Sequence, residues 1–232
     1  MRKEIKILGA IVLIVIGAAV FGISYYRSSV QNARVTASNP SNKSDTPKPD
    51  AAQLVRPDSP SIGPVDAKVT LVEFYDPECE TCAEFAPIIK KILKDYNGRL
   101  RYVARFMPLH PNSMTAATFI SAAGEQGKYW EAQELLFEKQ PEWGTKHGPS
   151  PASPATPINQ LFDKYGKELG LDLTKAAAAI NEKRFDAKIA QDKKDGQSLG
   201  VRRTPTFIVN GRELVNFGES GLRQLIDEEL KK

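Results

Sequence analysis

Apolar residues recur with two periods along residues 55–232, and each period predicts one type of element. Runs rich in β-branched and aromatic residues predict strands at 68–75, 100–106, 206–209 and 213–215. Helical spacing predicts helices at 83–96, at 113–140 with a break near 124–127, and at 157–169, 173–194 and 219–231. Asn210-Gly211 lies between the last two strands and predicts a tight hairpin turn. The order of elements indicates an α/β unit that carries a helical insertion.

The first 26 residues have a different pattern. Arg2, Lys3 and Lys6 precede an uncharged, apolar stretch over 7–26, which as a helix would span about 30 Å, the thickness of a bilayer core. Because no good small-residue cleavage site follows, we expect an uncleaved signal anchor, with a cleaved signal peptide as the alternative. The basic flank predicts a single-pass cell-membrane protein with a cytoplasmic N-terminus and an extracytoplasmic remainder.

Three regions are therefore expected. Residues 1–26 form the basic tip and the transmembrane anchor, and residues 27–54, rich in Ser, Asn, Asp, Pro and Lys, form a flexible linker. The folded domain covers 55–232, with its helical insertion at about 112–196.

Composition and charge exclude several functions. Hydrophobic residues make up 41% and charged residues 26% of the chain, and the net charge is +4. No stripe of Lys and Arg interleaves with aromatic residues, so we expect no nucleic-acid partner. The two histidines and two cysteines have no zinc-site spacing, so no metal is expected either.

The two cysteines lie three positions apart in Cys79-Glu80-Thr81-Cys82. A strand is predicted before them and a helix after them, which places the pair at a helix N-terminus. The partial positive charge and free N–H groups of such a terminus stabilise a thiolate, which predicts a redox-active dithiol. Outside the cytoplasm, where we place this domain, disulfides persist. A purely structural cysteine pair is the alternative.

Several motifs accompany the dithiol. They are Gly63-Pro64 with Asp66-Ala67 and Val69, then Val72-Glu73-Phe74, Pro87 five residues after Cys82, and Gly200-Val201 followed by Thr204-Pro205-Thr206-Phe207 and Val209-Asn210-Gly211. In this combination the sequence resembles the DsbA-like family of thioredoxin-fold thiol:disulfide oxidoreductases over residues 55–232. The resemblance implies a thioredoxin fold whose βαβ half and C-terminal ββα half are separated by the helical insertion.

The resemblance also implies roles for individual residues. Cys79 is expected to be the exposed nucleophile with a lowered pKa, and Cys82 the more buried resolving thiol. Pro205 is expected to be a cis-proline facing the dithiol, which leaves the Thr204 backbone free to pair with a substrate chain. An ordinary trans proline at the start of a strand is the alternative.

Glu73 is expected to be a buried acid that accepts or relays the Cys82 proton, because burial raises a carboxyl pKa into a useful range. An outward-facing glutamate on an edge strand is the alternative. Its alternation with Leu71 and Tyr75 favours burial.

The sequence also departs from the family. Glu80 and Thr81 stand between the cysteines, where family members commonly have proline and histidine or an aromatic residue. Asp76, Glu78 and Glu84 add negative charge nearby, which Arg202 and Arg203 would partly offset. Since carboxylates raise the pKa of a neighbouring thiol, we expect a weaker oxidant than a strong oxidase.

Two other groups of residues are expected to have no part in the redox chemistry. His110 is expected to be a surface-loop residue and not a partner of the dithiol. Trp130 and Phe137 are expected to belong to the core of the helical block and not to a cofactor pocket.

The predicted function is thiol–disulfide exchange on cysteine-containing exported proteins, most simply disulfide formation, by a monomer without a bound cofactor. The resemblance implies a membrane redox partner of the DsbB or vitamin-K-epoxide-reductase type. A reductase or isomerase kept reduced by an electron carrier is the first alternative. A thioredoxin-fold module that holds unfolded chains without chemistry is the second.

Overall fold

The computed structural model of this protein describes residues 51–145 and 156–232. Its centre is a five-stranded sheet in the order β1-β3-β2-β4-β5. The strands are β1 (Ser61–Ile62), β2 (Val69–Tyr75), β3 (Leu100–Phe106), β4 (Thr206–Val209) and β5 (Arg212–Glu213). β2 and β3 are parallel, and the other neighbouring pairs are antiparallel. The strands predicted at 68–75, 100–106 and 206–209 are confirmed, whereas β1 was not predicted.

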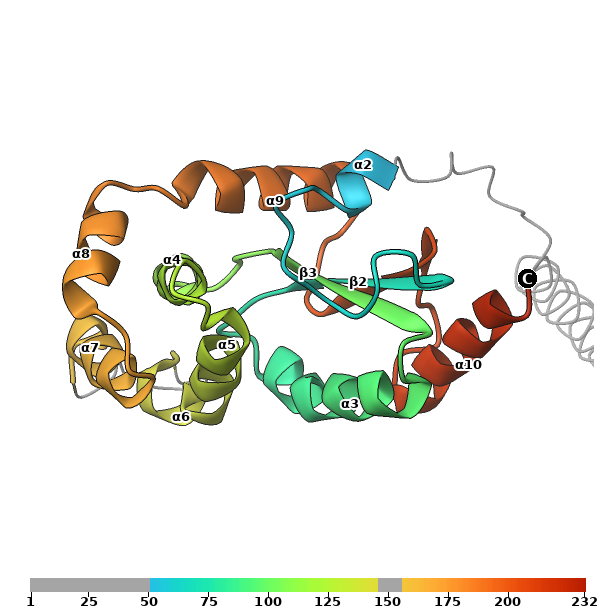
Figure 1. The fold of residues 1–232 in the computed structure, drawn as a ribbon, viewed down its shortest axis with the longest axis horizontal. Coiled ribbons are helices and arrows are strands. Elements are labelled where there is room, and N and C mark those ends of the chain that lie inside the picture. Colours follow the sequence, from blue (N-terminus) through green and yellow to red (C-terminus); the bar gives the residue numbers. More distant parts are fainter. Residues whose placement is uncertain (1–50, 146–155) are drawn as a thin grey trace, which may run out of the picture. The chain divides into compact units, whose positions relative to one another are not determined.

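The helices cover both faces of the sheet and extend beyond one end of it. They are α2 (Ala51–Leu54), α3 (Glu80–Tyr96), α4 (Ser113–Gly124), α5 (Tyr129–Glu138), α6 (Gln140–Trp143), α7 (Ile158–Glu168), α8 (Leu173–Asn181), α9 (Asp186–Ser198) and α10 (Glu219–Leu230). Figure 1 shows α3 and α10 along one face, α9 along the other, and α4 to α8 beyond the sheet. The expected order of a βαβ half, a helical insertion and a ββα half is confirmed.

The alternation along β2 assigns its side chains to the two faces. Leu71 and Tyr75 belong to the large core cluster under α3, while Val72 and Phe74 belong to a second cluster with Leu54. All four of these β2 residues are buried, as expected for a strand that helices cover on both sides. Glu73 has the same parity as Leu71 and Tyr75 and therefore points to the α3 side.

The Asn210-Gly211 turn joins β4 to β5. Both residues have positive φ, 47° and 84°, as a type I′ hairpin turn requires. The hairpin prediction is confirmed, although β5 spans 212–213 instead of 213–215.

The single helix predicted at 173–194 is wrong, because the chain forms two helices there. The chain turns after Asn181, Lys183 has a φ of 53°, and Phe185 is buried as the new helix begins. Burial of Phe185 therefore outweighs the continuous helical pattern at this point.

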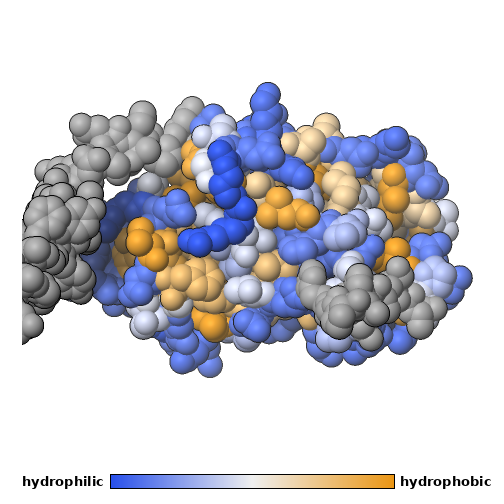
Figure 2. Space-filling view, turned by 180° about the vertical axis from the view of Figure 1, so that it is seen from behind, coloured by the Kyte–Doolittle hydropathy of each residue, from blue (hydrophilic) through white to orange (hydrophobic). Residues whose placement is uncertain are grey.

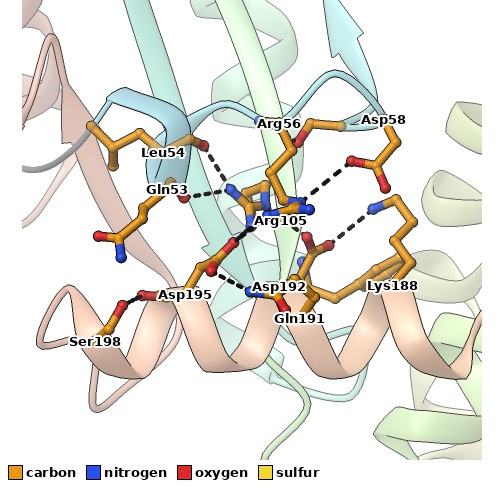
Figure 3. A network of polar contacts seen from close by, with 12 residues as sticks. Gln53, Leu54, Arg56, Asp58, Arg105, Lys188, Gln191, Asp192, Asp195 and Ser198 are labelled. Carbon is orange, nitrogen blue, oxygen red and sulfur yellow. Dashed lines mark hydrogen bonds and ion pairs between the residues drawn. The ribbon is translucent and has the colours of Figure 1, made fainter.

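A buried arginine fixes the start of the folded unit. Arg105 on β3 has no exposed surface, and its guanidinium donates to Asp192 (2.8 Å) and Asp195 (2.7 Å) on α9. It also donates to the backbone carbonyls of Gln53 (2.7 Å) and Leu54 (2.9 Å), so α2, β3 and α9 meet at one side chain (Figure 3). The folded unit therefore includes residues 51–54, which were predicted to belong to the linker.

The predicted anchor at 7–26 and most of the predicted linker lie outside the described residues. Within residues 51–145 and 156–232, no helix combines the length and the apolar character that crossing a membrane requires. Figure 2 shows one face of the domain, on which apolar side chains gather in several places among hydrophilic ones.

Candidate active site

The two cysteines lie where β2 passes into α3. Cys79 is the N-cap residue of α3, and its backbone N–H donates to the Asp76 carbonyl oxygen at 3.1 Å. Cys82 follows in the first helical turn, and both residues are thiols. The exposed fraction is 7% for Cys79 and 1% for Cys82, so Cys79 is the more accessible thiol but is less exposed than expected.

The surroundings of Cys79 favour its thiolate. The Cys82 thiol, as hydrogen-bond donor, is the main cause that lowers the Cys79 pKa from 9.0 to about 6. Thr204 and the backbone N–H groups of Thr81 and Cys82 lower the Cys79 pKa further, while burial opposes them. The geometry thus favours a thiolate, the reactive form of a cysteine, at the helix N-terminus.

Cys82 has the opposite tendency. Burial raises its pKa well above 9.0, and the hydrogen bond to Cys79 and the charge of Glu73 raise it further. Glu73 is buried, and burial raises its pKa from 4.5 to about 7, while a hydrogen bond from the Tyr102 hydroxyl lowers it. A carboxyl group that titrates near neutral pH beside a protonated thiol has the properties of a proton acceptor for that thiol.

The Thr204–Pro205 segment lies against the nucleophile from the start of β4. The Thr204–Pro205 peptide bond is cis, as the resemblance implied. The Cys79 Sγ donates to the Thr204 carbonyl oxygen at 3.3 Å, so the two segments are in contact despite 125 residues between them. The Thr204 hydroxyl is buried and has no hydrogen-bond partner within the described residues, so it can turn toward a thiolate at Cys79.

The other residues singled out from the sequence have simpler positions. Glu80 is exposed and Thr81 half-buried in the first turn of α3. Arg202 is exposed, and its guanidinium donates to the carbonyl oxygens of Gln197 (3.0 Å), in the last turn of α9, and of Val201 (3.1 Å), its neighbour in the loop.

Two carboxylates that looked like free negative charges are instead buried and bound. Asp76 accepts hydrogen bonds from the backbone N–H groups of Glu78 (2.8 Å) and Leu109 (2.6 Å). It also contacts the His110 Nδ1 at 2.7 Å and accepts from the Ser113 hydroxyl. The expectation that His110 is an ordinary surface-loop residue is therefore wrong, since its ring is bound to the turn that carries the dithiol.

The Glu78 carboxylate is likewise bound by backbone N–H groups. It accepts from the Asn112 backbone N–H at 2.6 Å and from the Thr145 backbone N–H at 2.7 Å. These bonds connect the β2–α3 turn to Asn112, at the end of the loop between β3 and α4, and to Thr145, which follows α6.

A pocket of about 410 Å³ opens beside the second thiol, between α3 and α5. Cys82, Glu73 and Tyr102 line it together with Trp130 and Phe137. Trp130 and Phe137 pack against the core as expected, but they are half-buried and also face this pocket, which sequence reasoning missed. The pocket brings the buried acid and the resolving thiol close to solvent.

Comparison with known proteins agrees with this geometry. The sequence model of one protein family, thioredoxin, matches residues 56–228. The chain belongs to the thioredoxin family, among its DsbA-like thiol–disulfide oxidoreductases.

Solved structures of this family superpose well on the chain. The thioredoxin-like oxidoreductase from Silicibacter pomeroyi DSS-3 is 26% identical, with a TM-score of 0.64 over 79% of this chain and 99% of the other. Oxidised BdbD from Bacillus subtilis is 25% identical, with a TM-score of 0.63 over 80% and 97%. Wolbachia pipientis alpha-DsbA1, at 20% identity and a TM-score of 0.65 over 77% and 94%, shares the fold.

Similar domains also occur inside larger proteins. The chain is 37% identical over 162 residues to the Na(+)/H(+) antiporter NhaA 3 of Salinispora tropica. That alignment covers 68% of this chain but 22% of the antiporter, so the chain spans about a fifth of the length of the curated relatives it matches.

Proposed function

We propose that this chain introduces disulfide bonds into exported proteins by exchanging a Cys79–Cys82 disulfide with their thiols. The observation that carries the proposal is the contrast between the thiols: Cys79 has a pKa lowered to about 6, and the pKa of Cys82 is raised well above 9.0. A thiolate that is stable at neutral pH is a good leaving group, so the equilibrium is displaced toward the reduced enzyme and the oxidised substrate.

The exchange takes two steps. A substrate thiolate attacks the Cys79 sulfur, the Cys79–Cys82 bond breaks, and Cys82 leaves with the electron pair. Cys82 then takes up a proton, for which Glu73 is the nearby donor. A second substrate thiolate attacks the substrate sulfur of the mixed disulfide, and Cys79 leaves as a thiolate. Two electrons have then passed from the substrate to the dithiol, and the substrate carries a new disulfide.

The substrate backbone has a suitable place to bind. Thr204 lies beside Cys79, before the first residue of β4, so an extended chain can pair with it while its cysteine reaches the nucleophile.

The proposed site of action is the outer face of the cell membrane. The apolar stretch at 7–26 and the basic residues before it support a tether, and a linker to about residue 50 would let the domain reach substrates near the membrane. Reoxidation then needs a membrane acceptor of the DsbB or vitamin-K-epoxide-reductase type.

One observation favours the opposite direction of electron flow. The Cys79 pKa of about 6 is well above the value of about 3.5 that accompanies the strongest oxidants. A reductase or isomerase, kept reduced by an electron carrier, is therefore the second candidate.

The decisive experiment compares both directions. The oxidised protein is mixed with reduced, unfolded ribonuclease A, and the reduced protein with insulin and a fixed ratio of reduced to oxidised glutathione. We expect the oxidised protein to restore ribonuclease activity stoichiometrically, and the Cys79→Ser variant to restore none. Rapid reduction of insulin without any oxidation of ribonuclease would support the reductase instead.

The same variant tests the holding function. If the Cys79→Ser protein suppresses aggregation of unfolded ribonuclease as well as the wild type, and the wild type catalyses neither reaction, the domain is a binding module.

A further inference from the structure

The loop that follows β3 is bound directly to the turn that carries the nucleophile. The two oxygens of one carboxylate, Asp76, make the connection: Oδ1 accepts from the Glu78 backbone N–H and Oδ2 contacts the His110 ring. Glu78 immediately precedes Cys79 in the chain. A single buried carboxylate therefore separates the imidazole from the dithiol turn.

The contact with Asp76 determines which ring nitrogen of His110 carries a fixed hydrogen. The carboxylate of Asp76 can only accept, so Nδ1 of His110 carries a hydrogen and Nε2 is the nitrogen that gains or loses the titrating proton. The His110 backbone N–H also bonds to Asp76 (3.2 Å) and to the Ser113 Oγ (3.1 Å), which holds the ring in place. The His110 side chain is 27% exposed, so its proton can exchange with solvent.

The polar groups around this ring and its loop come from three elements, two of which bring charge. The β2–α3 turn contributes Asp76, Glu78 and Cys79, and these are the groups whose charges act on His110. From α9, Lys193 donates to the Pro108 carbonyl oxygen at 2.8 Å and brings a positive charge to the same loop. From α4, the Ser113 hydroxyl is uncharged.

We propose that His110, held against Asp76, is the positive charge that offsets the buried carboxylate and stabilises the Cys79 thiolate. The proposal deepens the thiol exchange proposed above and rests on it. Without the imidazolium, the negative charge of the buried Asp76 carboxylate, in the same turn as Cys79, would oppose formation of the thiolate. The positive charge reaches the dithiol turn from the loop after β3.

The electrostatics of the ring agree with this role. Burial lowers the His110 pKa, but the hydrogen bond to Asp76 and the charges of Asp76, Cys79 and Glu78 outweigh it and raise the pKa above 6.5. Since the coupling between two titrating groups is reciprocal, a thiolate that raises the His110 pKa must have its own pKa lowered by the same amount.

The first test replaces the imidazole. In His110→Gln we expect the Cys79 pKa, measured from thiolate absorbance at 240 nm, to rise by roughly half a unit to one unit, because the opposite charge is near but not in contact. Lys193→Gln is the matched control, since it removes a positive charge from the surroundings of the same loop and leaves the imidazole. It should move the Cys79 pKa by less than half as much.

The second test needs no change at position 110. The His110 pKa is measured by NMR in the reduced wild type and in Cys79→Ser, with the resonance assigned from the His110→Gln spectrum. We expect it to be lower in Cys79→Ser, by the same number of units that His110→Gln adds to the Cys79 pKa. A structural role for His110 would not produce this equality.

The outcomes separate this proposal from the proposed function. If His110→Gln leaves the Cys79 pKa unchanged while ribonuclease oxidation proceeds, the inference is wrong and the function stands. If the His110 pKa is the same in the reduced wild type and in Cys79→Ser, the inference is also wrong, whether or not the His110 variant folds. If the wild type exchanges no disulfides, the proposed function is wrong.

Discussion

The low pKa of Cys79 predicts a specific dependence of stability on pH. The pKa falls from 9.0 to about 6 in the folded, reduced protein, and the residue is only 7% exposed. Because the folded protein loses this proton at lower pH than the unfolded chain, the thiolate adds stability as the pH rises from about 6 toward 9. The contribution is lost when the pH falls through 6.

The size of the effect follows from the two pKa values. By proton linkage the thiolate contributes about 1.4 kcal/mol at pH 7, about 2.7 kcal/mol at pH 8 and almost nothing at pH 5. For a two-electron couple, about 1.4 kcal/mol corresponds to about 30 mV. The low Cys79 pKa therefore raises the reduction potential at pH 7 by about 30 mV relative to the same dithiol with an unshifted Cys79 pKa.

The assay is guanidinium unfolding of the reduced protein at pH 5, 6, 7 and 8, compared with Cys79→Ser. Both proteins carry Glu73→Gln, because Glu73 also titrates near pH 7 and is coupled to Cys79. The serine also changes the packing, which shifts the unfolding free energy by the same amount at every pH. The informative quantity is therefore how the difference in unfolding free energy between the two proteins changes with pH. A difference in unfolding free energy that stays flat from pH 5 to 8 would refute the assigned pKa.

Three further substitutions test Glu73, the buried Arg105 and the turn at Gly63 that follows β1. Glu73→Gln should slow the reverse of the first exchange step, in which Cys82 attacks a mixed disulfide at Cys79, roughly tenfold or more, because Cys82 loses the base that takes its proton; Glu80→Gln, at an exposed acid, should not, and equal rates would contradict the role. Arg105→Met should lower the free energy of unfolding by about 3–5 kcal/mol, since two buried aspartates lose their partner; Arg184→Met, whose ion pairs with Glu125 and Glu182 are exposed, should cost less than about 1 kcal/mol, and similar losses would refute the difference. Gly63→Ala should lower the free energy of unfolding by roughly 1–3 kcal/mol, because the φ of Gly63 is 98° and the new Cβ would lie 2.3 Å from the Leu100 carbonyl oxygen. An unchanged midpoint of guanidinium unfolding would show that this turn relaxes.

Periodicity predicts most of the fold because the central strands are buried on both faces. β2 and β3 are rich in β-branched and aromatic residues, and their predicted bounds differ from the structure by one residue at most. The break between α8 and α9 could not be predicted, since the residues around Lys183 keep a helical pattern and only the packing of Phe185 shows the turn. The two-residue strand β1 is too short to produce a pattern.

The site was partly predictable for a similar reason. Residues close to the dithiol in the sequence, such as Glu73, could be found from alternation along their own strand. Tyr102 and His110 could not, because their places depend on the register of β3 against β2 and on a loop held by Asp76. His110 gave one signal, a histidine between two prolines directly after a core strand, but spacing alone did not connect it to Cys79.

The proposed chemistry depends on Cys79 being the ionised, accessible thiol and Cys82 the protonated, buried one. The most direct test alkylates the folded, reduced protein with iodoacetamide between pH 4 and 9 and locates the label by mass spectrometry. We expect label on Cys79 alone, with a rate that reaches half its maximum near pH 6. Label that appears first on Cys82, or a rate that rises only above about pH 8 as for an ordinary cysteine, would contradict it.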